Sequence, residues 1–134
     1  MSLSDRMKEA GLKFSTESEG SGSSYLQGSF TFEDGRHQQF FLRKEADEWG
    51  GHSENDLTAV IGPAADPANV KKACEMANAK KRGGVVVDTS NPPLICLKVE
   101  ISTDVSGETA YNQVAMTCIM ADEMEKEIFG GDEW

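Results

Sequence analysis

Residues 114–121 read Val-Ala-Met-Thr-Cys-Ile-Met-Ala and form the most apolar part of a longer segment, residues 108–129. Apolar residues recur in this segment every three or four positions, which predicts a long helix ended by the glycines that follow. One stripe along the helix consists of Ala110, Val114, Thr117, Ala121, Met124 and Ile128. Because Met116, Ile119 and Met120 lie off that stripe, the helix needs a second burial partner besides a sheet of its own chain. That partner is either the rest of the core or a second subunit.

Residues 25–44 predict a β-hairpin. Apolar and polar residues alternate through residues 25–33, and Asp34-Gly35, a strong turn signal, precedes a second predicted strand at residues 36–44. A two-residue loop would place Phe41 on the same face as Phe30, whereas a three-residue loop with a bulge would place Phe40 opposite Phe30. The sequence leaves both registers open. In each of them, one of the two neighbouring phenylalanines lies on the second face of the hairpin.

Shorter patterns complete the predicted fold. Residues 4–14 predict an amphipathic helix, and the Gly/Ser/Glu-rich residues 15–24 predict a flexible connection. After an acidic loop at residues 45–56, we expect strands at 57–62, 85–88 and 94–102 and a helix that begins at Asp66-Pro67. The chain is thus predicted to be a single α+β domain, residues 1–134, with an antiparallel sheet of about five strands and the order α-β-β-β-α-β-β-α. Residues 1–24 would hold the first helix and the flexible linker, and residues 25–134 the main body.

The charge balance restricts the partners of the protein. The 134 residues include 13 lysines and arginines against 23 aspartates and glutamates, a net charge of −10. This excess argues against binding to nucleic acid or to an anionic membrane surface, because both need clustered cations. No apolar run is long enough to span a membrane, and no secretory signal is visible. Cys74, Cys96 and Cys118 lie in apolar surroundings without a C-x-x-C spacing, so we expect buried, reduced thiols in a cytoplasmic protein.

Motifs for catalysis or for cofactor binding are absent from the sequence. Gly20-Ser21-Gly22 is not followed by the Lys-Ser/Thr pair of a phosphate loop, and no G-x-S-x-G elbow occurs. His37 and His52 are too few for a metal cluster. A solvated helix face is the expected setting of four carboxylates in the last helix, Asp122, Glu123, Glu125 and Glu127. We therefore predict a protein without enzymatic activity, cofactor or metal.

The chain resembles the YbjN-like proteins, whose fold is that of class I type III secretion chaperones. The resemblance rests on residues 36–42 (Arg-His-Gln-Gln-Phe-Phe-Leu), on Ile61-Gly62-Pro63, and above all on residues 114–132, where A-D-x-x-E at residues 121–125 precedes a Gly-Asp end. It covers residues 25–134. It implies a homodimer that acts without a cofactor and, as in secretion chaperones of this fold, holds an extended stretch of a client protein.

Candidate partner contacts are the aromatic and two-sided apolar positions named above. They are Phe40, Phe41 and Leu42 in the hairpin, Trp49 in the acidic loop, and Met116, Ile119 and Met120 in the last helix. The acidic surface favours a client with a basic segment. We therefore expect a chaperone-like, protein-binding homodimer. The alternatives are a regulatory or structural dimer that holds no client, and a small enzyme of unrecognised type.

Overall fold

The structure is a computed structural model, and it describes residues 2–20, 23–43, 47–49, 52–80, 83–89 and 91–130. Three helices and seven strands occur in this part of the chain. In chain order they are α1 (Leu3–Glu9), β1 (Phe14–Gly20), β2 (Ser23–Thr31), β3 (His37–Arg43), β4 (Asp47–Trp49), β5 (His52–Pro63), α2 (Pro67–Lys80), β6 (Gly84–Asp88), β7 (Leu94–Ser102) and α3 (Gly107–Phe129).

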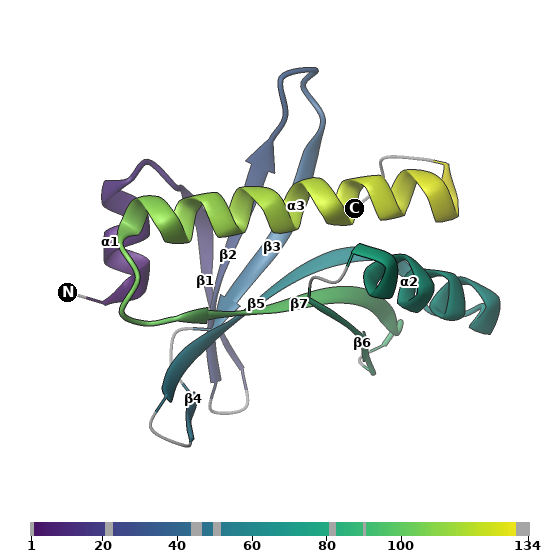
Figure 1. The fold of residues 1–134 in the computed structure, drawn as a ribbon, viewed down its shortest axis with the longest axis horizontal. Helices are drawn as coiled ribbons and strands as arrows, with labels where there is room; N and C mark the ends of the chain where they lie inside the picture. The colour runs from purple at the N-terminus through teal and green to yellow at the C-terminus, as the bar shows by residue number, and fades with distance from the viewer. Residues whose placement is uncertain are drawn as a thin grey trace.

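The described strands form one antiparallel sheet in the order β1-β2-β3-β5-β7-β6, and β4 is a short addition paired with β5. The predicted α+β fold is confirmed, because the five expected strands β2, β3, β5, β6 and β7 follow one another among the helices in the expected order. All three helices pack on the same face of the sheet, with α1 and α2 near the two ends of the long α3 (Figure 1). We call the opposite, helix-free face the open face.

Two segments differ from the prediction. The described part of residues 15–24, expected to be a flexible connection, belongs to β1 and to the start of β2, with Glu17 opposite Leu26. The described part of residues 45–56, expected to be an acidic loop, contains β4 and the first residues of β5. In both segments, backbone pairing with a neighbouring strand outweighs a composition that is typical of loops.

The register of the β2–β3 hairpin is neither of the two considered from the sequence. The backbone nitrogen of Phe32 donates to the carbonyl oxygen of Arg36 at 2.7 Å, so the loop has three residues. Gly35 ends it in the left-handed conformation, with φ of 88°, which suits glycine because it has no Cβ. Gly28 therefore lies opposite Phe40, and Phe40 is the phenylalanine that faces the helices.

Two apolar clusters fill the space between the helices and the sheet. The first lies beneath α1 and the N-terminal half of α3, and it includes Met7, Phe40 and Val114. The second lies beneath α2 and the C-terminal half of α3, and it includes Ala77 and Met124. The helix α3 contributes to both clusters, as do the strands β5 and β7, so these three elements join the two parts of the core.

Two glycines make room for aromatic rings in these clusters. A Cβ atom at Gly28 would lie 2.2 Å from Cζ of Phe40, and one at Gly62 would lie 2.3 Å from Cε2 of Phe129. Both distances are far inside van der Waals contact. The two rings therefore occupy space that any other residue would fill with its own side chain.

The ends of α3 are set by local hydrogen bonds. The hydroxyl oxygen of Ser106 accepts a hydrogen bond from the backbone nitrogen of Thr109 at 3.1 Å, which caps the first turn. Gly130 closes the last turn with φ of 71°, the conformation that commonly ends helices. Neither α3 nor any other helix in the described part of the chain is long and apolar enough to cross a membrane.

Candidate functional site

A groove of about 460 Å³ crosses the open face of the sheet. Its lining comes from five strands: Tyr25, Gln39, Phe41, Thr58, Val60, Val86, Asp88, Leu94 and Cys96. Val60 and Cys96, which pair across β5 and β7, are almost fully buried and form the floor. Tyr25 and Val86 are more than one-third exposed and form parts of the rim. The groove has the size and the mostly apolar lining of a binding site.

A row of charged side chains lies beside the groove on the open face. Oδ2 of Asp56 lies 3.7 Å from Nη1 of Arg43 and 3.5 Å from Nζ of Lys98. Arg43 and Lys98 extend from the strands on either side of β5, so the three side chains form a ladder across the sheet. Neighbouring opposite charges of this kind stabilise strand pairing modestly and keep the end of the groove polar.

The groove contains one of the three cysteines, Cys96, whose thiol is buried and has a raised pKa. Burial, and to a lesser extent the charge of Asp88, raise the pKa of Cys96 to about 11. Cys118 lies on the side of α3 that packs in the first cluster, and its burial there raises the pKa of the thiol to about 12. Both residues confirm the prediction of buried thiols. The prediction is wrong for Cys74, which is exposed. In α2 the preceding residue, Ala73, faces the sheet and is buried, so Cys74 faces away from it.

Three of the predicted partner contacts are instead part of the core. Phe40, Leu42 and Met120 are at most 5% exposed, so a partner cannot reach them in the folded chain. Phe40 and Leu42 face the helices because the hairpin register turns alternate residues of β3 inward. Met120 packs in the second cluster, so the second apolar face of α3 is completed partly by the core of the same chain.

The remaining predicted contacts lie on two different surfaces. Phe41, between Phe40 and Leu42 in β3, points to the open face and lines the groove. Met116 and Ile119 lie on the outer side of α3, where they are 50% and 38% exposed. The backbone of Trp49 belongs to β4, while its side chain lies outside the described residues. The seven positions therefore do not come together as one site.

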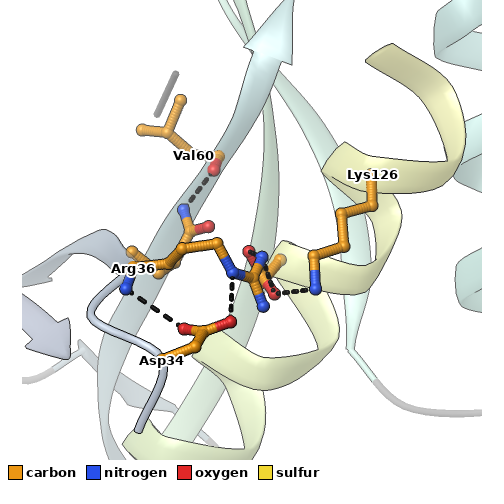
Figure 2. Close-up of polar contacts among 6 residues, drawn as sticks. Asp34, Arg36, Val60 and Lys126 are labelled. Carbon is orange, nitrogen blue, oxygen red and sulfur yellow. Dashed lines mark hydrogen bonds and ion pairs between the residues drawn. The ribbon is translucent and has the colours of Figure 1, made fainter. Parts of the chain in front are cut away.

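The carboxylates of α3 are only partly solvated, contrary to the prediction. Glu123 and Glu127 are exposed, but Asp122 and Glu125 are buried. Nη1 of Arg36 donates to both carboxylate oxygens of Asp122, and Lys126 approaches one of them at 3.4 Å. Figure 2 shows this cluster between the β2–β3 loop and α3. Asp122 therefore fastens the hairpin to the helix.

A buried glutamine lies near this cluster. Gln38 is fully buried, and its side-chain nitrogen donates to the carbonyl oxygen of Val60 in β5 (Figure 2). The β5 strand has a bulge at this point, between Val60 and Gly62. The pairs of β3 with β5 end at Phe40 opposite Ala59, and the Gln38 side chain links the two strands just beyond that pair.

Comparison with known proteins does not identify a relative. No family model matches the chain, and no curated protein matches its sequence. Within the described residues, no three histidine, cysteine or acidic side chains are grouped as metal ligands would be. The candidate site is therefore the groove on the open face, defined by its geometry and chemistry.

The groove was only partly visible in the sequence. Alternation in β2 and β7 indicated two faces for each strand, and the adjacent phenylalanines placed one aromatic ring on the second face of the hairpin. The contribution of Val86 and Leu94 depends on β6 and β7 lying at the far side of the sheet, which alternation does not encode. The signal that was available was Phe41, the one predicted contact that lines the groove.

Proposed function

We propose that this protein is a non-enzymatic, chaperone-like binding module that acts as a homodimer and holds an extended segment of another protein on the open face of its sheet. The groove is the observation that carries the proposal. It spans five strands and combines an apolar floor with aromatic and polar lining residues. Such a surface suits an extended peptide better than a compact substrate.

The resemblance to YbjN-like proteins and to type III secretion chaperones supports the same proposal through the order of elements, which agrees with the expected α+β fold. A net charge of −10 favours a basic partner segment, because complementary charge accelerates encounter and disfavours acidic competitors. We also propose a reducing, cytoplasmic location, which the free thiols of Cys96 and Cys118 support.

The experiment compares two variants that add the same charge on opposite faces. Thr58→Arg places a long cation in the groove, whereas Met116→Arg places one on the half-exposed outer side of α3. Tagged wild type and both variants are used to recover partners from a lysate of the source cells, and peptides from the recovered protein are then titrated by calorimetry.

We expect wild type and Met116→Arg to bind the same basic peptide and Thr58→Arg to lose at least about tenfold in affinity. Affinity should also fall as salt rises from 50 to 500 mM, because the charge contribution is screened. Equal binding by both variants would contradict a site in the groove. Affinity that is independent of salt would contradict a basic partner.

A further inference from the structure

Strand β6 ends the sheet and presents an apolar edge. It reads Gly-Val-Val-Val-Asp at residues 84–88, and Val86 and Val87 are 38% and 39% exposed. No strand in the described part of the chain pairs with its outer side, and Figure 1 shows it at one end of the sheet. Edge strands are usually protected from pairing with other chains by lysine, proline or a bulge. The apolar centre of β6 has none of these.

The opposite edge of the sheet differs in composition. Strand β1 reads Phe-Ser-Thr-Glu-Ser-Glu-Gly at residues 14–20. Charged residues such as its two glutamates are a composition by which edge strands avoid pairing with other chains. The two edges are therefore not equivalent, and β6 is the one suited to pairing.

We propose that two copies of this chain associate by antiparallel pairing of their β6 strands, with Val86 of one copy opposite Val86 of the other. This inference rests on the homodimer of the proposed function and names its interface. A twofold axis perpendicular to the sheet would relate the copies and join the two sheets into one continuous sheet.

The register follows from the length of the strand. Only the pairing centred on Val86 overlaps all five residues of β6, and it places Val85 opposite Val87 of the second copy. Val85 and Val87 both lie on the helix-covered side of the sheet, where Val85 packs against the second apolar cluster. Pairing would extend this cluster across the axis and cover Val87, which is exposed in the single chain.

The charges on the open face fit the same register. Gly84 lies opposite Lys98 of β7, and the pairing places Asp88 of the second copy on the other side of Gly84. Strands are about 4.8 Å apart, so Lys98 and that aspartate would be separated by roughly 10 Å between their Cα atoms. A lysine and an aspartate side chain can span this distance, and glycine leaves the space between them free. The twofold axis produces this contact between Lys98 and Asp88 twice, once on each side of the axis.

The pairing would also change the shape of the binding surface. Val86 and Asp88 line the groove at its β6 end. When β6 of the second copy lies alongside, the two grooves meet at the axis and form one surface of twice the length. A dimer of this form would hold a longer extended segment than either copy alone.

The test uses charge reversal at the axis, followed by analytical ultracentrifugation. Val86→Lys and Val86→Glu each place like charges directly opposite one another, so each variant should dissociate at least about tenfold more readily than the wild-type dimer. An equimolar mixture of the two should regain a dimer of one copy of each, because the charges are then complementary. Ile119→Lys, at a position on α3 with the same 38% exposure, should remain dimeric.

The outcomes separate this inference from the proposed function. If the wild type and the Val86→Lys variant are equally dimeric, the β6 interface is overturned, but the homodimer of the proposed function is not. Wild type that stays monomeric at all concentrations overturns the dimer itself. Monomeric single variants that do not associate when mixed overturn the Val86 register.

A cross-link provides an independent readout should a charged variant fail to fold. Val86→Cys in a Cys74→Ser background should form a disulfide-linked dimer on oxidation. Opposed residues of antiparallel strands have Cα atoms about 4.5 to 5.5 Å apart, within the range that a disulfide bridges. A product that stays monomeric on a non-reducing gel overturns the interface.

Discussion

Nη1 of Arg36 lies 2.8 Å from Oδ1 and 2.9 Å from Oδ2 of Asp122, two residues separated by 86 positions in the sequence. The guanidinium is also held by Asp34, whose Oδ2 lies 2.7 Å from its Nε. The turn of the hairpin therefore orients the arginine, and the arginine neutralises a carboxylate that is buried beneath it. The positive charge of Arg36 compensates for the loss of solvation of the buried Asp122 carboxylate. The same contact fixes the point at which the hairpin packs on α3.

Replacing Arg36 with alanine should destabilise the fold by about 1–3 kcal/mol, because the buried Asp122 loses the guanidinium that donates to both of its oxygens and keeps the longer ion pair with Lys126. Urea denaturation followed by circular dichroism measures the loss. The control is Lys80→Ala, which removes the exposed pair between Lys80 and Glu123 and should cost less than about 1 kcal/mol. Equal losses in the two variants would contradict a structural role for the Arg36–Asp122 pair.

Gly28→Ala should destabilise the protein by about 1–3 kcal/mol, since its Cβ would overlap the ring of Phe40. Ser29→Ala, at the exposed next residue of the same strand, is the control. Thermal denaturation of both variants at one protein concentration provides the comparison. The double variant Gly28→Ala, Phe40→Leu should recover part of the loss. A Gly28→Ala protein as stable as wild type would show that Phe40 can move away freely.

Met120→Glu should cost roughly 3 kcal/mol or more, because it places a charge in the second apolar cluster. Ile119→Glu adds the same charge one residue earlier, on the outer side of α3, and should change stability by about 0.5 kcal/mol or less. Denaturation midpoints measure the difference. Similar midpoints would mean that the two faces of α3 are assigned incorrectly.

Of the three thiols, Cys74 alone should react quickly with Ellman's reagent in the native protein at pH 8. The pKa of Cys96 is about 11, so only about one thousandth of this thiol is ionised at that pH, and Cys118, with a pKa of about 12, is ionised still less. Raising the pH should therefore increase the reactivity of Cys96 before that of Cys118 while the fold persists. Cys74→Ser should abolish the fast phase, and all thiols should react in denaturant. A fast phase that survives in Cys74→Ser would contradict this assignment.

Elements with strong internal patterns were predictable from the sequence. Residues 94–102 alternate throughout, and β7 occupies those same residues. The 108–129 periodicity predicted α3 to within one residue, because its stripe and its terminal glycines agree. The strand β1 was missed because nothing in Phe14–Gly20 alternates between apolar and polar residues. Its pairing with β2 is a relation between segments, which local composition does not carry.

The candidate site was less predictable than the fold. Alternation separates the two faces of β3, yet it does not say which face the helices cover, so Phe40 and Phe41 could not be told apart. The burial of Asp122 was hidden for a similar reason. Its partner Arg36 lies in a hairpin far away in the sequence, and a carboxylate among other carboxylates is usually solvated.

Because α3 contributes to both apolar clusters, neither cluster can be fully buried before α3 has been synthesised. At translation rates of roughly 5–20 residues per second, the 23 residues of α3 take about one to five seconds to make. During that time only α1 and α2 can cover the inner face of the sheet, so the apolar residues beneath α3 stay exposed. Until α3 has emerged from the ribosome and packed on the sheet, these apolar residues are open to contacts with other chains.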